Sequence, residues 1–337
     1  LSLIEHGALK PGDRVPGDIQ LSEVLNLNRW TVRKAMSRLV EKGLLKRTRR
    51  AGTFVTGLAS PAPVTIGFFY FFEAAAVMGM RGEYIQQYCA TQGADLVIVA
   101  FQRDYYSTVD LLDEVRKKRL KGAIVVPLNN EDCLRSLQRM DEARFPYVRL
   151  GNAWFTGQLK APLVKGDDAG CVRMALEHLW SLGHRRIGFF GKHPGNINEQ
   201  TYREYMASRG PHPSRWTGSY EYDGTVEQWR KLPAADITRA YLKASPDVTA
   251  IITEDGASAV EFVRQAPALG RLVPRDLSII ALSGDWPGIE GASPAITSFS
   301  VSHAEMSQTA ARALFDIIQN GPPAEEIIHY IPFHLHA

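Results

Sequence analysis

Basic side chains gather between residues 29 and 50 of this 337-residue chain, and their chemistry suits nucleic-acid recognition. Arg29 and Arg33 stand four residues apart in a segment whose apolar spacing predicts a helix. A guanidinium group can donate two parallel hydrogen bonds to guanine, a contact that discriminates against other bases by about 1–3 kcal/mol. We therefore expect this helix to read base edges in a DNA groove.

Two predicted helices position these arginines. Apolar residues at helical spacing run from Asp18 to Leu25, a short turn follows, and Asn28 is a suitable N-cap for the next helix, which Gly43 ends. In the second helix the apolar stripe consists of Val32, Ala35, Met36, Leu39 and Val40. This stripe is expected to face a small core, which turns the basic residues outward as in a helix-turn-helix.

A hairpin wing is predicted after the second helix. Two short strands, Leu44–Thr48 and Thr53–Thr56, are joined by a basic turn that contains Arg49 and Arg50 and can reach phosphate or a minor groove. The sequence leaves two roles open for Trp30. Its ring either contacts DNA, at a sugar or a thymine methyl group, or packs against this wing.

Four motifs between Gly7 and Val55 occur in a fixed order, namely GALKPGDRVP, NRWTVRKAM, LVEKGLL and AGTFV. In order and spacing they resemble the GntR family of bacterial transcription regulators. The resemblance implies that the second helix contacts the bases and the backbone of DNA, and that Gly52 and Thr53 belong to the tip of the wing. The expected DNA-binding residues are Arg29, Trp30, Thr31, Arg33, Lys34, Arg49, Arg50, Gly52 and Thr53. Ile19 stands where the family has a DNA-facing arginine, so the operator sequence is expected to differ.

Charge and composition agree with this assignment. Residues 1–57 hold 11 Lys+Arg against 5 Asp+Glu, whereas the whole chain has a net charge of only +3. A small basic segment on a mildly acidic remainder is the electrostatic footprint of nucleic-acid binding. The chain shows neither an apolar run long enough to span a membrane nor a secretory signal, and its three cysteines are far apart. We expect a cytoplasmic protein with reduced thiols.

The sequence predicts two domains and a linker. Residues 56–63, TGLASPAP, lack periodicity, which places a DNA-binding domain at 1–57, a linker at 58–63 and a larger domain at 64–337. In the larger domain, β-rich runs alternate with amphipathic helices, and this scheme occurs twice. The alternation predicts an α/β fold of two lobes with parallel sheets behind a small winged helix-turn-helix. The chain is expected to cross between the lobes near residue 165 and within residues 290–320.

Several motifs of the larger domain resemble the LacI/GalR family of effector-binding domains, which share the fold of periplasmic sugar-binding proteins. They are GDDAG and ALEHLWSLGHRRIGFFG between Gly166 and Gly191, then VTAIITEDGAS, LVPRDLSIIAL and HAEMSQTAARALFDII. The resemblance implies a homodimer joined through this domain and a small effector, usually a sugar, bound between the lobes. Ligands of open α/β sheets bind outside the carboxyl ends of the strands.

The effector site is where the chain departs from that family. An arginine that commonly holds sugar hydroxyls aligns with Asn198, and the first aspartate of a strand-end pair aligns with Ser283. The family's Asn-Asp pair appears as Glu254-Asp255. Residues expected to line the site are Phe72, Glu73, Asn152, Asn198, Glu199, Tyr222, Glu254, Asp255, Ser283, Asp285 and Trp286.

Catalytic motifs are missing from the sequence, which has no dinucleotide-binding glycine motif after the first strand, no phosphate-binding loop, no His-Glu-x-x-His and no Gly-x-Ser-x-Gly. We therefore expect no enzymatic activity and no cofactor. Metal is not expected either, because His329, His334 and His336 lie on an apparent closing strand.

The sequence thus predicts a transcription regulator, a repressor, whose affinity for double-stranded operator DNA is controlled by a sugar-like ligand. Two alternatives stay open. The first is a sugar-binding or sugar-processing protein without a regulatory role, which the basic N-terminal segment disfavours. The second is a ligand-independent DNA-binding protein with a degenerate cleft, which Asn198 and Ser283 favour.

Overall fold

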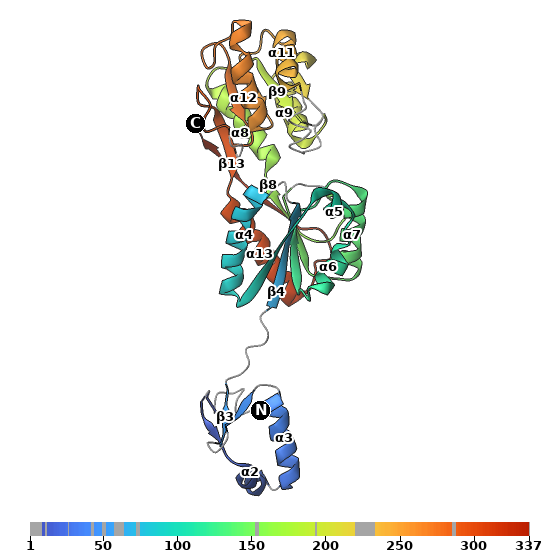
Figure 1. The fold of residues 1–337 in the computed structure, drawn as a ribbon. Helices are drawn as coiled ribbons and strands as arrows, with labels where there is room; N and C mark the ends of the chain where they lie inside the picture. Colours follow the sequence, from blue (N-terminus) through green and yellow to red (C-terminus); the bar gives the residue numbers. More distant parts are fainter. Residues whose placement is uncertain are drawn as a thin grey trace. The chain divides into compact units, whose positions relative to one another are not determined.

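The computed structural model describes residues 9–10, 12–25, 27–41, 44–48, 52–56, 64–71, 75–151, 155–192, 194–219, 233–284 and 288–336. The chain divides into two compact units. We call them the head, Leu1–Thr65 with Gly93–Asp95, and the body, Ile66–Gln92 with Leu96–Ala337. Figure 1 shows the helices and strands of each unit.

The head is a winged helix-turn-helix, as the sequence predicted. Helix α2 (Asp18–Leu25) precedes helix α3 (Arg29–Glu41), and the side chain of Asn28 accepts a hydrogen bond from the backbone nitrogen of Trp30 at 2.8 Å. The strands form an antiparallel sheet in the order β1-β3-β2. Their bounds are Arg14–Val15 for β1, Leu45–Thr48 for β2 and Gly52–Val55 for β3.

A small apolar core holds the head together. Val32 and Met36 of α3 are buried against Leu45 and Val55 of the wing, and Leu39 and Val40 pack at its margin. Ala35, which the sequence analysis placed on the same stripe, is exposed. It lies at the edge of the stripe, outside the core cluster of the head.

The body contains two lobes, each built on a six-stranded sheet. In lobe 1 the strand order is β14-β8-β7-β6-β4-β5, and the pairs from β14 to β4 are parallel. Its strands are β4 (Val64–Phe71), β5 (Ala94–Phe101), β6 (Gly122–Val125), β7 (Tyr147–Leu150), β8 (Leu163–Gly166) and β14 (Ile328–Ile331). Helices α4 (Ala75–Thr91) and α13 (His303–Asn320) cover one face of the sheet (Figure 1). The other face carries α5 (Arg103–Thr108), α6 (Leu111–Lys117) and α7 (Glu131–Glu142).

In lobe 2 the strand order is β10-β9-β11-β12-β13-β15, with β15 antiparallel to β13 and the other pairs parallel. Its strands are β9 (Ile187–Gly191), β10 (Thr217–Ser219), β11 (Ala250–Thr253), β12 (Ser278–Ala281), β13 (Thr297–Val301) and β15 (Phe333–His336). Its helices are α8 (Asp168–Ser181), α9 (Ile197–Ala207), α11 (Ala234–Ala244) and α12 (Gly256–Gln265). Each lobe has its own apolar core.

The described chain crosses between the lobes at three points. Strand β8 of lobe 1 leads into α8 of lobe 2, β13 of lobe 2 leads into α13 of lobe 1, and β14 of lobe 1 leads into β15 of lobe 2. Each crossing follows the carboxyl end of a parallel strand. The carboxyl edges of both sheets therefore face the boundary between the lobes.

The third crossing, at Pro332, is not among those expected from the sequence. His329 belongs to β14, whereas His334 and His336 belong to β15, so the single closing strand expected there is wrong and two strands of different lobes take its place. The crossings are tightly packed. A Cβ atom on Gly166, at the end of β8, would lie 2.5 Å from a ring carbon of Phe333, at the start of β15.

All three cysteines are buried free thiols, as the sequence predicted. Burial raises the pKa of Cys89 and of Cys133 to about 11, and it raises the pKa of Cys171 as well. Each thiol therefore stays protonated at neutral pH and behaves as a small apolar core residue.

Candidate functional site

The solvent-facing side of α3 carries the DNA-binding residues that the sequence predicted. Val32 and Met36 turn one side of the helix into the core, and every predicted DNA-binding residue of α3 is exposed. They are Arg29, Trp30, Thr31, Arg33 and Lys34. Three of the five lie on the first turn of the helix, the part of a recognition helix that contacts base edges.

Trp30 does not pack against the wing. Its side chain is 68% exposed, and the ammonium nitrogen of Lys34 lies 5.1 Å from the centre of its ring. The two residues are four apart on one helix, so this cation–π contact favours a ring that lies along the outer face of α3.

One acidic residue lies beside this basic face. A carboxylate oxygen of Asp18 is 3.9 Å from Nε of Arg33, and the other is 3.4 Å from Nη2 of Arg47. Exposed ion pairs of this kind contribute at most about 1 kcal/mol. Arg33 can therefore exchange Asp18 for groups on DNA at little cost.

The wing presents further basic groups. Gly52 has φ +118°, and a Cβ atom there would lie 2.8 Å from Nε of Arg14, so this exposed arginine lies beside the start of β3. Arg14 was missing from the sequence-based set because it precedes the helix-turn-helix and meets β3 only through strand pairing. Thr53 is half-buried on β3, and Arg49 and Arg50 lie outside the described residues.

A polar cluster in lobe 2 lies at the carboxyl ends of β9 and β11. One carboxylate oxygen of Glu254 accepts hydrogen bonds from the side-chain nitrogens of Asn196 and Asn198, each at 2.7 Å. The other accepts from the backbone nitrogen of Lys192 at 2.5 Å. The structure therefore brings together Asn198 and Glu254, which the sequence placed in the effector site from separate motifs.

Asn196 and Lys192 were not predicted. Asn196 is the N-cap of α9, where its side-chain oxygen accepts a hydrogen bond from the backbone nitrogen of Glu199 at 3.0 Å. An asparagine before an amphipathic run is a recognisable N-cap signal, so this residue could have been found. Lys192 takes part through its backbone, which no side-chain pattern reveals.

The orientation of the Asn198 amide is fixed by Glu254. A carboxylate can only accept hydrogen bonds, so the amide nitrogen faces it and Oδ1 points away. That oxygen is buried and has no hydrogen-bond partner among the described residues. An unpaired buried acceptor costs about 1–3 kcal/mol, which marks Asn198 as a position where a ligand or an ordered water would stabilise the lobe.

Two other predicted residues are engaged within lobe 2. The carboxylate of Glu199 accepts from the backbone nitrogen of Gly195 at 2.8 Å and from Nε of Arg203 at 2.7 Å. Asp255 caps α12 by accepting from the backbone nitrogen of Ser258 at 2.8 Å and from its hydroxyl at 3.1 Å. Both carboxylates are buried and shape the start of a helix at the carboxyl edge of the sheet.

The remaining predicted residues fall into two groups. Ser283 is half-buried two residues beyond β12, at the same carboxyl edge where Asp255 follows β11. The others lie outside the described residues: Phe72, Glu73, Asn152, Tyr222, Asp285 and Trp286.

Lobe 1 places a buried arginine at its own carboxyl edge. Nε of Arg81, in α4, donates to Nδ1 of His303 at 3.3 Å, and Nη2 lies 3.4 Å from the sulfur of Met306. A Cβ atom on Gly151, which follows β7, would lie 3.9 Å from Nη1 of the same arginine. Arg81 therefore links α4 to the start of α13, where the chain has just crossed from lobe 2.

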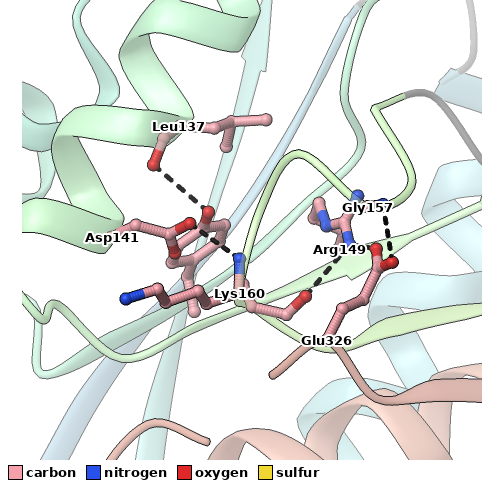
Figure 2. Close-up of polar contacts among 8 residues, drawn as sticks. Leu137, Asp141, Arg149, Gly157, Lys160 and Glu326 are labelled. Carbon is pink, nitrogen blue, oxygen red and sulfur yellow. Dashed lines mark hydrogen bonds and ion pairs between the residues drawn. The ribbon is translucent and has the colours of Figure 1, made fainter. Parts of the chain in front are cut away.

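A buried ion pair holds the loop that follows β7 (Figure 2). The side chain of Arg149 is fully buried, and its Nη2 donates to the carboxylate of Glu326 and to the carbonyl oxygen of Ala161, the latter at 3.0 Å. Glu326 also accepts from the backbone nitrogen of Gly157 at 2.8 Å, and Asp141 accepts from that of Lys160 at 2.8 Å. These contacts fasten the loop to β7, to α7 and to the segment before β14.

The described residues contain no group of three metal-ligating side chains, and Nε2 of His336 in β15 lies 2.6 Å from the hydroxyl of Ser300 in β13. No helix within the described ranges is long and apolar enough to span a membrane.

Family models match the head and the C-terminal part of the body. Residues 1–55 match the GntR family of bacterial regulatory proteins, and residues 176–337 match the periplasmic binding protein-like domain. The chain is 24% identical over 328 residues to the arabinose metabolism transcriptional repressor of Geobacillus stearothermophilus, which covers 95% of this chain and 89% of that protein.

Two solved structures have a similar fold. A regulatory protein of the LacI family from Chloroflexus aggregans superposes with a TM-score of 0.67 at 22% identity, over 81% of this chain and 99% of that one. The transcriptional regulator CelR in complex with cellobiose gives a TM-score of 0.66 at 20% identity, over 96% of this chain and 99% of that one. The protein thus joins a winged helix-turn-helix head that matches the GntR family to a body with the fold of the periplasmic binding protein-like domain.

Proposed function

We propose that this protein is a cytoplasmic, sequence-specific transcription regulator, a repressor, whose affinity for operator DNA is controlled by a small sugar-like ligand. The observation that carries the proposal is the exposed basic face of α3 in a chain that also holds the Glu254 cluster at a strand-end edge. The similarity to an arabinose repressor and to a cellobiose-bound regulator supports a sugar as the ligand class.

The effector site lies at the carboxyl edges of the two sheets, with Asn198 and Glu254 contributing from lobe 2. Planar amide and carboxylate groups suit sugars because they fix several hydrogen-bond directions at once. A ligand that contacts both edges favours one arrangement of the lobes over another. The packed crossings, where Gly166 meets Phe333 and Arg81 meets His303, are the points through which that arrangement is set.

The working regulator is a homodimer joined through the body. Two heads related by two-fold symmetry bind two half-sites of a pseudo-palindromic operator. A change in the arrangement of the lobes alters the affinity with which the two heads bind the two half-sites together. A coupling free energy of about 1–3 kcal/mol, typical of allostery, changes operator affinity by about 5- to 150-fold.

Substitution of Glu254 by glutamine tests the effector half of the proposal. The variant keeps the size of the side chain, but a neutral amide cannot accept all three N–H donors that Glu254 now accepts. In the proposed site Glu254 also accepts a hydrogen bond from a ligand hydroxyl, and one charged hydrogen bond contributes about 1.5–3 kcal/mol, so we expect ligand affinity to fall by about 10- to 150-fold. A thermal-shift screen of the full chain against monosaccharides, disaccharides, sugar acids and sugar phosphates supplies the ligand, and calorimetry measures its affinity.

Glu177→Gln is the matched control, since it removes the same charge from an exposed position on α8 of the same lobe. It is expected to bind the ligand as the unaltered chain does. Equal affinities for the Glu254→Gln variant and this control would remove Glu254 from the site. A panel in which no compound stabilises the protein would contradict a sugar effector, because a ligand at 100 times its Kd stabilises by about 2.7 kcal/mol.

A further inference from the structure

Trp30 is a large aromatic side chain on the face of the head where polar residues predominate. Its ring is 68% exposed on the first turn of α3, with Arg29 before it and Arg33 and Lys34 one turn beyond. A single exposed apolar side chain is ordinary on a protein surface, so the informative feature is its position among basic residues on the first turns of α3. The basic residues around the ring make DNA the complementary partner.

The ring of Trp30 lies against Lys34 of the same helix. Lys34 places its ammonium group 5.1 Å from the ring centre, and at an exposed site such a contact favours this position of the indole by about 0.5–1 kcal/mol. The backbone nitrogen of Trp30 is bound to Asn28 at 2.8 Å, so the residue belongs to the ordered cap of α3. The ammonium group of Lys34 can then reach a phosphate while the indole faces the bases.

From this geometry we propose that Trp30 recognises a thymine in the major groove through its 5-methyl group. Among the four bases, thymine alone presents an apolar group there, with the O4 acceptor beside it. The indole presents a matching pair, an apolar ring edge and an N–H group that can only donate. Arginines at 29 and 33 are suited to guanine, so Trp30 extends recognition to a base that they do not read.

This inference rests on the proposed DNA binding, but it makes a separate claim. Stacking of the ring on a deoxyribose would also bury it, and would add affinity without preference for any base. Direct reading of the methyl group instead makes the affinity depend on that one group. Deoxyuridine differs from thymidine only in lacking it, so substitution of thymine by uracil isolates the contact.

The experiment uses the full chain and a binding site obtained by repeated selection from random-sequence DNA. Each thymine of the selected half-site is replaced singly by uracil, and affinities are measured by fluorescence anisotropy for the unaltered protein and for Trp30→Ala. We expect at least one position where uracil weakens binding of the unaltered protein by about fourfold, the effect of one buried methyl-sized group. The Trp30→Ala variant should bind thymine and uracil equally at that position.

The result does not depend on the variant alone, because the uracil series of the unaltered protein is itself a test. Insensitivity to uracil at every thymine, or a selected site without thymine, would overturn the inference. So would a Trp30→Ala variant that keeps the full difference between the two bases. Failure to select any sequence would instead count against sequence-specific binding as such, which separates the two claims.

Discussion

Replacement of Glu326 by leucine is expected to lower the free energy of unfolding of the body by about 3–5 kcal/mol. The change leaves the guanidinium group of Arg149 fully buried without the carboxylate that now accepts its hydrogen bond, and an uncompensated buried charge carries a cost of this size. It also removes the acceptor for the backbone nitrogen of Gly157. Urea unfolding followed by circular dichroism measures the effect.

Two further variants make this result interpretable. Glu325→Leu removes a charge from the adjacent, exposed position and should stay within about 0.5 kcal/mol of the unaltered protein. The double variant Arg149→Met with Glu326→Leu should recover most of the loss, because apolar residues can replace a buried ion pair at little cost. If Glu326→Leu unfolds at the same urea concentration as Glu325→Leu, the ion pair does not hold the loop.

Loss of Arg33 is expected to have the largest effect on DNA binding. Arg33→Ala removes one base contact from each of two half-sites, so at about 1–3 kcal/mol per contact the dimer loses about 2–6 kcal/mol of operator affinity. Operator affinity therefore falls by about 30-fold or more, whereas ligand binding by the body is unchanged. Anisotropy titration with selected DNA and calorimetry with the ligand measure the two quantities.

Arg38→Ala is the matched control because it removes the same charge from an exposed position at the other end of α3. Base edges are contacted by the first turns of a recognition helix, so this variant should lose only a small electrostatic contribution. Arg33→Lys keeps the charge but cannot form a bidentate contact, so the difference in affinity between the selected site and other DNA sequences should become smaller. Equal losses for the alanine variants of Arg33 and Arg38 would show that the helix contributes only charge.

The head could be predicted almost entirely from the sequence. Its helices are defined by local signals, namely the spacing of Val32 and Met36 and the cap at Asn28, and these operate within a few residues. The prediction that Ala35 faces the core was wrong, because the spacing of apolar residues along a helix does not show which of them lie at the edge of the buried stripe. The exposure of Trp30 depends on where the wing folds, which local spacing does not determine.

The body was predictable in its alternation of strands and helices but not in its connections. Strands β14 and β15 are separated by one proline, and only their pairing with β8 and β13 shows that they belong to different lobes. Such pairings join segments far apart in the chain and leave no periodic signal between them. The expected closing strand was wrong for this reason.

In the effector site, family resemblance placed Asn198 and Glu254 in one pocket, but their direct hydrogen bond required the structure. The engagement of Glu199 by Arg203 lies within one helix and was accessible to helical spacing. Arg149 and Glu326 are 177 residues apart, and Arg81 and His303 are 222 apart. No pattern within a single element predicts pairs at such separations.

The central claim is that ligand and operator binding are coupled in one chain. The measurement that tests it most directly is an operator titration of the full chain, with and without a saturating sugar identified by thermal shift. We predict a change in operator affinity of about 5- to 150-fold, with an equal change in ligand affinity when operator is bound. The Glu254→Gln variant should need about 10- to 150-fold more ligand to show the same change in operator affinity. Identical operator affinity at saturating ligand would contradict the account and leave a DNA-binding protein whose body does not control its head.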